Sequence, residues 1–387
     1  MNRNCPVCAG ERKEILYEQI FHDNSLTLMN GYSIVICDDC GFCFADRIPS
    51  QLEFNLYYEQ MSKYEYDRYD NYPSNDQMKH YAKIVDFIEP HLSNKNANIL
   101  DLGCSTGGLL SIFKERGFQN LLGIDPSPAC VNSVKRLFGV DANVSNFSEL
   151  TTEKTCDLVI LSEVLEHIVD LQGILAKIRS IISDNGYLFI EVPDSGRWEA
   201  QISAPFQQFS VEHINYFSQD SLNNLLLKNG FSTSACREVD YISEKINEPV
   251  IMLLATKNSA AIENNNLKKD TVQPVRKYVA KCLENDKMLK ALLAEKLSGI
   301  DRIIVWGVGT HTLRLLEHGL DIRKIQYFVD SNPRYTGKTI SGLIIKAPGD
   351  IREQDTPIIV STFLYQDEIT NQIKHSLRLK NPVITIY

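Results

Sequence analysis

Short apolar runs alternate with amphipathic stretches over two parts of the chain. Each run is four to six residues long and lies between polar or glycine-containing segments. Apolar runs of this length between helical stretches predict βαβ units and mostly parallel sheets. The runs are residues 98–102, 120–124, 158–161 and 187–192 in the first part, and residues 302–306, 325–329 and 357–360 in the second.

The positions of these runs divide the chain into four predicted segments. A lobe rich in cysteine and tyrosine covers residues 1–75, and the first α/β part covers residues 76–257. Residues 258–298 begin with a polar stretch rich in Asn and Lys and continue with a helical pattern, which predicts a linker followed by a helix. The second, smaller α/β part covers residues 299–387. A chain of this length accommodates two or three domains.

The charge balance and the lack of long apolar runs narrow the class of protein. Forty basic side chains against 49 acidic ones give a formal net charge of −9, which argues against a general nucleic-acid binder because such a protein needs a basic face. No run approaches the roughly 18 apolar residues of a membrane span, and the first residues lack the apolar region of a signal peptide. We therefore expect a cytoplasmic protein that binds neither membranes nor nucleic acids. The oligomeric state is not indicated.

The amino-terminal lobe carries two pairs of cysteines with metal-ligand spacing. Cys5 and Cys8 form one Cys-x-x-Cys pair, and Cys37 and Cys40 form the other. Four thiolates on two tight turns suit a tetrahedral zinc ion with no open position, which makes the predicted site structural rather than catalytic. The alternative is a set of reduced structural thiols. Cys43 is a fifth thiol in this region, and we expect it to be a small buried residue.

A glycine-rich turn follows the first apolar run of the larger α/β part. It contains Asp101, Gly103 and Gly107 in the pattern Asp-x-Gly-x-x-x-Gly and leads into a helical stretch. Glycines there let the backbone turn sharply and approach a ligand. The next apolar run ends at Asp125, 24 residues after Asp101. An acidic residue at the end of the second strand of such a unit can bind a ribose diol.

This pattern resembles the first motif of class I S-adenosylmethionine methyltransferases, in which Ser105 replaces the usual middle glycine. Residues 157–167 resemble the fourth strand and ensuing helix of that family, and residues 185–193 resemble its fifth strand. The resemblance implies a Rossmann-like α/β fold and S-adenosylmethionine as cofactor. Glu166 and His167 would either contact the cofactor or order the loop near it. The implied cofactor-binding residues are Asp101, Gly103 and Gly107 at the methionine and sulfonium end, Asp125 at the ribose, Asn146 and Phe147 at the adenine, and Glu163.

The loop after the fifth predicted strand carries the candidate catalytic residues. Glu212 and His213 are adjacent there, and two titratable groups on one short loop suit removal of a proton from a carbon or a hydroxyl. Methyl transfer is an in-line displacement, so the protein must mainly align the acceptor and take its proton. The alternative is a pair that only orders the loop.

The order of the segments gives a narrower resemblance, to the zinc-containing three-domain sugar C-methyltransferases. Those enzymes methylate a carbon beside the keto group of a nucleotide-linked deoxysugar, and their loop reads Tyr-x-Glu-His. Ser210 stands at the tyrosine position here, so the acceptor atom stays open between carbon, oxygen and nitrogen. The tyrosine-rich stretch around Tyr64 and Tyr66 corresponds to the segment that folds over the cofactor, or it packs the lobe onto the core.

The carboxyl-terminal part looks like half of a Rossmann fold. Gly307 and Gly309 form a Gly-x-Gly turn, and Asp330 follows 21 residues after Gly309. Thr312 stands in place of the third glycine that a dinucleotide binder has. In the resembled family this domain helps to hold the nucleotide-sugar, and the alternative is a packing domain. His311 is expected to be a turn residue or a substrate contact.

The leading hypothesis is methyl transfer from S-adenosylmethionine to a nucleotide-activated sugar, with Glu212 and His213 removing the proton. The nearest alternative is an O- or N-methyltransferase that acts on another small polar metabolite. A further alternative is an NAD-dependent oxidoreductase that uses the carboxyl-terminal part, which the missing third glycine opposes. The last alternative is a non-enzymatic nucleic-acid module built on the zinc lobe, which the acidic net charge opposes.

Overall fold

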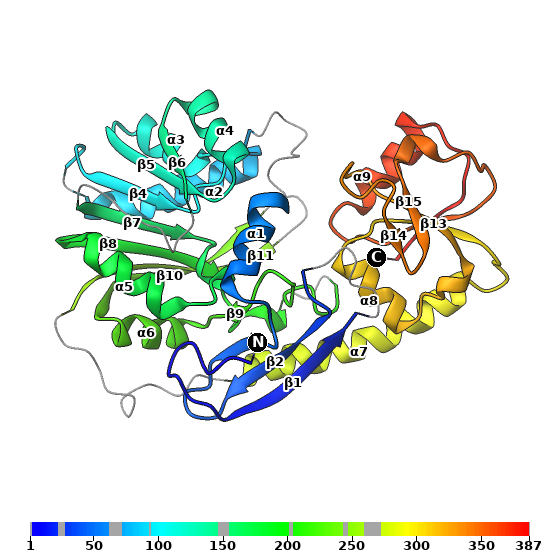
Figure 1. Cartoon of the computed structure of the whole chain (residues 1–387), viewed down its shortest axis with the longest axis horizontal. Helices are drawn as coiled ribbons and strands as arrows, with labels where there is room; N and C mark the ends of the chain where they lie inside the picture. Colours follow the sequence, from blue (N-terminus) through cyan, green and yellow to red (C-terminus); the bar gives the residue numbers. More distant parts are fainter. Residues whose placement is uncertain are drawn as a thin grey trace. The chain divides into compact units, whose positions relative to one another are not determined.

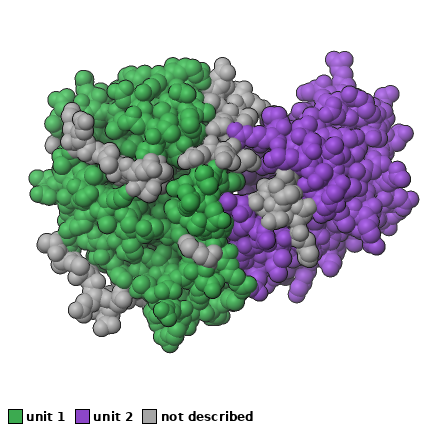
Figure 2. All heavy atoms as spheres, viewed as in Figure 1, with its two compact units in different colours: residues 1–16, 34–201, 212–275 green, residues 17–33, 202–211, 276–387 purple. Residues whose placement is uncertain are grey.

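A computed structural model describes most of the chain, as residues 2–21, 28–61, 72–92, 94–145, 155–200, 204–242, 247–258 and 272–386. The chain forms two compact units, which Figure 2 shows in different colours. Unit 1 comprises residues 1–16, 34–201 and 212–275, and unit 2 comprises residues 17–33, 202–211 and 276–387. The cysteine-rich segment therefore shares unit 1 with the larger α/β part. The division into four segments stays a prediction.

A seven-stranded sheet forms the centre of unit 1, in the order β10-β11-β8-β7-β4-β5-β6 (Figure 1). The five strands from β8 to β6 run parallel, whereas β11 runs antiparallel to both of its neighbours. The predicted α/β fold with a Rossmann-like core is confirmed. The strands are β4 (Asn98–Leu102), β5 (Asn120–Asp125), β6 (Asp141–Val144), β7 (Cys156–Ser162), β8 (Ile182–Pro193), β10 (Phe231–Ile242) and β11 (Asn247–Lys257).

Helices cover both faces of this sheet, because its strands are apolar on both sides. On β4, Ile99 packs with the apolar residues of α2, α3 and α4, and its neighbour Leu100 packs with those of α5 and α6. Successive side chains of a strand point to opposite faces, so each strand contributes to both cores. The helices are α2 (Asn75–Ile88), α3 (Gly108–Glu115), α4 (Pro128–Phe138), α5 (Leu171–Ile181) and α6 (Gln219–Lys228).

The amino-terminal residues form a second, four-stranded sheet in the order β1-β2-β3-β9. Helix α1 (Gln51–Met61) follows β3, and its Phe54 is fully buried. Gln51 accepts a hydrogen bond from the backbone N–H of Val169 at 2.9 Å, which fixes the first turn of the helix. The strands are β1 (Lys13–Ile20), β2 (Gly31–Cys37), β3 (Cys43–Asp46) and β9 (Asn215–Tyr216).

Unit 2 contains a six-stranded sheet in the order β14-β15-β13-β12-β16-β17, in which only β14 is antiparallel to its neighbour. The sequence predicted β12, β13 and β16 as apolar runs. The short strands β14, β15 and β17 lack that signal. The elements are α7 (Gln273–Lys296), β12 (Ile303–Trp306), α8 (Thr310–His318), β13 (Ile325–Val329), β14 (Thr339–Ile340), β15 (Leu343–Lys346), β16 (Ile358–Val360), α9 (Gln366–Asn371), a π-helical turn (Gln372–Ser376) and β17 (Val383–Thr385).

Residues 204–211 are held within unit 2 by aromatic and polar contacts. The ring of Phe206 stacks on that of Tyr17, with centroids 4.0 Å apart, and the Arg314 guanidinium lies over its ring at 4.8 Å from the centroid. The hydroxyl of Tyr32 donates to the carbonyl of Phe209 at 2.6 Å. This stretch leads directly into Glu212, which belongs to unit 1.

In the described part of the chain, we find no helix that is long and apolar enough to cross a membrane. Short 3-10 turns connect several elements. The 3-10 turns are Glu89–His91, Leu165–His167 (η4), Trp198–Ala200, Ile322–Lys324 and Pro348–Asp350.

Two glycines with nearly the same backbone conformation allow the cost of a left-handed backbone to be measured separately from the cost of a steric clash at Cβ. Gly107 has φ +88°, and a Cβ there would lie 2.9 Å from Val134 Cγ1; Gly117 has φ +89° and nothing within 4 Å of its Cβ position. We expect Gly117→Ala to cost about 1–2 kcal/mol of unfolding free energy from the left-handed backbone alone. Gly107→Ala should cost about 1–3 kcal/mol more, because overpacking adds to the strain. Urea denaturation of both variants measures the difference, and equal losses would contradict the crowding.

Candidate active site

A cavity opens at the carboxyl ends of the parallel strands of unit 1. Its described lining comes from the ends of β4, β5, β7 and β8, from helices α1 and α2, from β10, and from the segment that precedes β9. Open α/β sheets bind their ligands at this edge. The cavity thus lies where the fold places a binding site.

The carboxylate of Asp125 holds the glycine-rich turn in place. Its Oδ2 accepts the backbone N–H of Ser105, and its Oδ1 accepts that of Ser127, both at 2.9 Å. Gly103 and Ser105 have φ of 82° and 47°, so both are in the left-handed region. That region costs a non-glycine residue about 1–2 kcal/mol, and the bond to Asp125 offsets part of this cost. A serine can therefore occupy the position that the resembled family fills with glycine.

Asp101 and Asp125 are two buried acids at the ends of adjacent strands. Burial raises the pKa of Asp101 to about 7, with a further contribution from the charge of Asp125. Burial also raises the pKa of Asp125 to about 6, against the opposing effect of its backbone hydrogen bonds. Both groups are costly to ionise without a counter-charge, so a cation at this edge would be stabilised.

Five of the predicted site residues line the cavity, namely Asp101, Gly103, Asp125, Glu163 and Glu212. Two other described residues, Gly107 and His213, lie outside the lining. Gly107 forms the left-handed start of α3, and the ring of His213 packs edge-on against His167 with centroids 4.7 Å apart. The predicted adenine contacts Asn146 and Phe147, and the tyrosines Tyr64 and Tyr66, lie outside the described residues.

The described lining is strongly acidic. It contains five carboxylates and, among the described residues, neither lysine nor arginine. Such a surface favours a ligand that carries positive charge and disfavours one that carries phosphate. The carboxylates are Asp101, Asp125, Glu163, Glu191 and Glu212.

A buried polar group formed by His80, Ser162 and Glu191 was not predicted. His80 Nε2 lies 2.7 Å from Glu191 Oε1, and the Ser162 hydroxyl donates to Glu191 Oε2 at 2.6 Å. Burial lowers the pKa of His80, but the hydrogen bond and charge of Glu191 outweigh it and the pKa is raised. His80 is on α2 and no motif marks it, because its partner is 111 residues away.

Two tyrosines of α1 extend polar atoms into the same cavity. The Tyr57 hydroxyl donates to Glu212 Oε1 at 3.0 Å, and the Tyr58 hydroxyl lies 3.0 Å from His167 Nδ1. Both tyrosines belong to the lining. The sequence marked them only as part of an aromatic stretch. The buried ring of Phe54 stacks near Tyr58, with centroids 6.4 Å apart, and anchors this part of the helix.

Buried hydrogen bonds of the backbone and of two side chains fix the segment that bears Glu212 and His213. The N–H of Ile214 donates to the carbonyl of Glu166 at 2.8 Å, and the Asn215 side chain donates to the carbonyl of Ile168 at 2.7 Å. The buried guanidinium of Arg3 donates to the carbonyl of Ile214 at 3.1 Å and to Asn215 Oδ1 at 2.9 Å. These bonds connect the loop to the η4 turn. Arg3 lies 211 residues from Ile214, so sequence spacing gave no sign of it.

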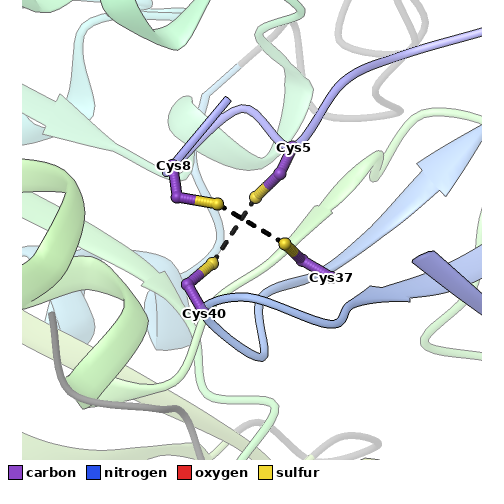
Figure 3. Close-up of side chains that lie close together, drawn as sticks. All are labelled: Cys5, Cys8, Cys37 and Cys40. Atoms are coloured by element: carbon purple, nitrogen blue, oxygen red, sulfur yellow. Dashed lines mark hydrogen bonds between the residues drawn. The ribbon is translucent and has the colours of Figure 1, made fainter. Parts of the chain in front are cut away.

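The four cysteines of the two Cys-x-x-Cys pairs converge on one point (Figure 3). Cys5 Sγ lies 3.5 Å from Cys40 Sγ, and Cys8 Sγ lies 3.4 Å from Cys37 Sγ. A zinc ion with Zn–S bonds of about 2.3 Å would set tetrahedral S···S distances of about 3.8 Å. All four side chains are buried. The donor set and its spacing fit such an ion.

Each cysteine pair sits on a turn with a left-handed residue just after its second cysteine. Ala9 has φ 65° and Gly41 has φ 81°. The left-handed Ala9 reverses the direction of the chain after Cys8, so that the N–H of Gly10 donates to the Cys8 sulfur at 3.3 Å. A donor aimed at sulfur stabilises a thiolate ligand.

Comparison with known proteins gives a match over the larger α/β part. Residues 74–235 match a family model described as a methyltransferase domain. A ubiquinone biosynthesis O-methyltransferase of Xanthomonas oryzae is 33% identical over 114 residues, which is 27% of this chain and 47% of that protein. The C-methyltransferase NovU of Streptomyces niveus is 24% identical over 190 residues, which is 47% of this chain and 43% of that protein. The chain thus spans less than half the length of these two relatives.

Solved structures were compared as well. A 1,6-didemethyltoxoflavin-N1-methyltransferase of Burkholderia thailandensis, solved with its substrate and S-adenosylhomocysteine, superposes with a TM-score of 0.43 at 18% identity, over 59% of this chain and 96% of that chain. The motifs, the strand order and the family match agree on one domain. Residues 74–235 match a methyltransferase domain, and the strands within them belong to a Rossmann-like sheet.

Proposed function

We propose that this protein transfers a methyl group from S-adenosylmethionine to a small polar acceptor. The observation that carries the proposal is the acidic cavity of the methyltransferase domain, where Asp101 and Asp125 end adjacent strands beside the glycine-rich turn. S-adenosylmethionine carries a sulfonium and an ammonium group, and both positive charges suit this lining.

The cofactor would lie along the edge formed by β4 and β5. Asp101 and Gly103 face the methionine and sulfonium end, and Asp125 faces the ribose with the lone pairs that its two backbone bonds leave over. Glu163, which has φ 54° and donates its N–H to the carbonyl of Glu191, presents its carboxylate to the same space. Gly107 contributes by allowing α3 to begin close to α4.

The proton of the acceptor would be taken by the loop that bears Glu212 and His213. Glu212 lines the cavity and is the member of the pair that can face an acceptor directly. His213 lies behind it, against His167. As the acceptor attacks the methyl carbon, its electron pair forms the new bond, the bond from sulfur to methyl breaks, and the acceptor's proton passes to the protein.

The acceptor class that we favour is a nucleotide-activated sugar. The order of the segments, which resembles that of the sugar C-methyltransferases, supports it. The match to C-methyltransferase NovU supports transfer to carbon, because that match covers 190 residues, against 114 for the match to the O-methyltransferase. The cavity lining also constrains it. A sugar fits among carboxylates and tyrosines, whereas a diphosphate needs cations that the described lining lacks, so the nucleotide would extend away from the carboxylates. Unit 2 is the proposed holder of that nucleotide.

Oxygen methylation is the second candidate. Ser210 replaces the tyrosine of the carbon-methylating loop, and O-methyltransferases of ubiquinone biosynthesis match part of this chain. A hydroxyl acceptor needs only a base, whereas a carbon acceptor also needs its neighbouring oxygen stabilised while the charge develops.

We also propose that Cys5, Cys8, Cys37 and Cys40 bind a structural zinc ion. All four ligand positions would be protein sulfur, which leaves no place for substrate or water. The ion would join the first turn of the chain to the end of β2, next to the buried side chains of Val35, Phe42 and Phe44.

The function is tested first by calorimetric titration of the purified chain with S-adenosylmethionine, and then by a mass-spectrometric screen of nucleotide-linked keto-deoxysugars for the gain of a methyl group. Saturable binding and one methylated product are expected. NMR of that product identifies the methylated atom. Absence of cofactor binding would overturn the proposal.

Asp125→Ala should weaken cofactor binding by about 1–3 kcal/mol, the cost of leaving hydrogen-bonding groups without a partner. Asp330→Ala is the matched control. The Asp330 carboxylate accepts the N–H of Val308 at 3.1 Å and that of Asn332 at 2.8 Å, as Asp125 does with its own turn, but it lies in unit 2. We expect the control to bind S-adenosylmethionine like the wild type. An equal loss in both variants would mean that the cofactor site is not at Asp125.

Asp101→Asn should change how the stability of the cofactor-free protein depends on pH. Because the pKa of Asp101 is raised to about 7 in the folded protein, its stabilising contribution is present below about pH 4 and is lost as the pH rises to about 7. Relative to the wild type, the variant should gain at least about 1.4 kcal/mol of unfolding free energy between pH 4 and pH 8, which corresponds to one pKa unit. Urea denaturation measures it. The exposed Asp141→Asn is the control and should show no such gain.

The zinc site is tested by elemental analysis of the purified protein. We expect about one zinc ion per chain and its loss in Cys37→Ser, together with a lower thermal midpoint. Cys43→Ala is the matched control, because Cys43 is buried in the neighbouring strand β3 and is not one of the four converging cysteines. This control should keep its zinc. A wild-type protein that is free of metal and retains its thermal midpoint in chelator would count against the site.

A further inference from the structure

The phenol that Ser210 cannot supply is present in the cavity on a different element. Tyr58 of α1 lines the cavity, and its hydroxyl lies 3.0 Å from His167 Nδ1. On the other side of the same imidazole, His167 Nε2 lies 3.9 Å from Glu166 Oε1. A hydroxyl, an imidazole and a carboxylate thus follow one another from the cavity into the core.

Glu166 is the inner end of this chain of groups. Its side chain is 1% exposed, and within the described residues neither of its carboxylate oxygens has a hydrogen-bond partner. Burial raises the pKa of its carboxyl well above the ordinary value, and the charge of Glu163 adds to this. The ring nitrogens of His167 and His213 lie within 4.8 Å of it. A buried carboxylate is stabilised only by a proton or a cation beside it, and these imidazoles are where such a proton can reside.

Two groups act on the position of the proton in the neutral imidazole of His167, namely the carboxyl of Glu166 and the carbonyl of Glu212. If Nδ1 carries it, Nδ1 donates to the carbonyl of Glu212, which is 3.0 Å away, and the lone pair of Nε2 faces the Glu166 carboxylate. If Nε2 carries it, the N–H faces the carboxylate, and the lone pair of Nδ1 accepts the Tyr58 hydroxyl. The second arrangement places a positive hydrogen toward the Glu166 carboxylate, whereas the first gives Nδ1 an acceptor in the carbonyl of Glu212. The relay requires the second arrangement.

We propose that Tyr58, His167 and Glu166 form a proton relay that exchanges a proton between the methyl acceptor and the core, and that Tyr58 provides the phenol that is absent at position 210. The inference rests on the methyl transfer proposed above, and it assigns the acceptor's proton to Tyr58 in place of Glu212. In it, Tyr58 is a catalytic residue because it faces the acceptor. His167 accepts the proton of Tyr58, and Glu166 is a positioning residue that acts through His167.

The relay balances the methyl transfer. The acceptor's bond to its proton breaks, and its electron pair attacks the methyl carbon, while the bond from sulfur to methyl breaks and neutralises the sulfonium. The proton passes to the Tyr58 oxygen as the Tyr58 proton passes to His167 Nδ1. The resulting imidazolium turns its Nε2–H toward the Glu166 carboxylate, 3.9 Å away, so that the new positive charge lies beside a negative one.

The groups around His167 determine how the relay responds to pH. Tyr58 faces it from α1, Glu212 and His213 face it from the segment before β9, and Glu166 faces it from its own turn. Glu163 lies close enough to act on Glu166 by its charge. In the active form His167 is neutral and Glu166 is a carboxylate, so the two groups together hold a single proton. The rate therefore rises with pH as the second proton of this pair is lost. Removal of the Glu166 charge should shift this rise to lower pH.

The first test uses NMR of the full chain, labelled with nitrogen-15 in histidine, and needs no acceptor. The neutral His167 should carry its proton on Nε2, and Tyr58→Phe should shift the Nδ1 resonance. Tyr187→Phe is the matched control, because Tyr187 is partly buried in β8 and does not line the cavity; it should leave His167 unchanged. A neutral His167 protonated on Nδ1 would overturn the relay.

The second test compares cofactor binding and turnover in Tyr58→Phe and Glu166→Gln, with the acceptor found in the screen above. Tyr58→Phe should lower kcat about 100-fold or more, the usual scale of general acid–base catalysis. Glu166→Gln keeps an oxygen that can accept the Nε2–H, and should shift the rising limb of the rate to lower pH. Both variants should bind S-adenosylmethionine with an affinity within about twofold of the wild type.

These outcomes separate the relay from the function on which it rests. Normal cofactor binding with unchanged kcat in Tyr58→Phe overturns the relay and leaves methyl transfer standing, whereas loss of binding in the wild type overturns both. A second equivalent of divalent metal that disappears in Glu166→Gln would also overturn the relay, because a cation would then occupy the space between Glu166, His167 and His213.

Discussion

The structure of the site depends on one buried carboxylate. Asp125 ends β5 and accepts a backbone N–H from the neighbouring turn and another from the start of its own helix. These two bonds fix the distance between the ends of β4 and β5, and they hold Ser105 in a conformation that serine seldom adopts. They add to the backbone bonds from Gly103 and Cys104 to the carbonyl of Ile124, and together these bonds form the wall of the cavity against which a cofactor would lie.

The same carboxylate illustrates a conflict between stability and binding. Asp101 and Asp125 are buried side by side, and the pKa of each is raised because ionisation is costly there. A fold optimised for stability alone would replace them with apolar residues. Their retention is explained if a positively charged ligand completes the site, since the ligand then supplies the missing counter-charge. The five carboxylates of the described lining extend this reasoning to the whole cavity.

Sequence reasoning succeeded where the signal was local. The apolar runs identified the parallel strands β4, β5, β7 and β8 but not β6, and Asp101, Gly103 and Asp125 all line the cavity. It also paired Cys5, Cys8, Cys37 and Cys40 before their sulfurs were seen to converge. Each of these depends on the preferences of a few consecutive residues, or on a repeated short motif, which a single sequence displays.

Sequence reasoning failed where the contact joins distant positions. The bond between Tyr58 and His167 spans 109 residues, and that between His80 and Glu191 spans 111. Arg3 fixes a loop more than 200 positions away. In each of these contacts at least one partner, Tyr58, His80 or Arg3, belongs to no motif, so only the folded chain could reveal the contact. Residues 17–33 and 202–211 belong to unit 2, although the chain on both sides of each belongs to unit 1. The order of motifs along the chain did not suggest this division.

The anchoring of residues 204–211 in unit 2 has a mechanical consequence. Phe206 and Phe209 are clamped by rings and a hydrogen bond of that unit, while the next residues carry the cavity-facing carboxylate of unit 1. The peptide bond between Val211 and Glu212 therefore joins a residue of unit 2 to a residue of unit 1. A substitution that loosens Phe206 or Phe209 would therefore reach Glu212 through the main chain, without changing any residue that lines the cavity.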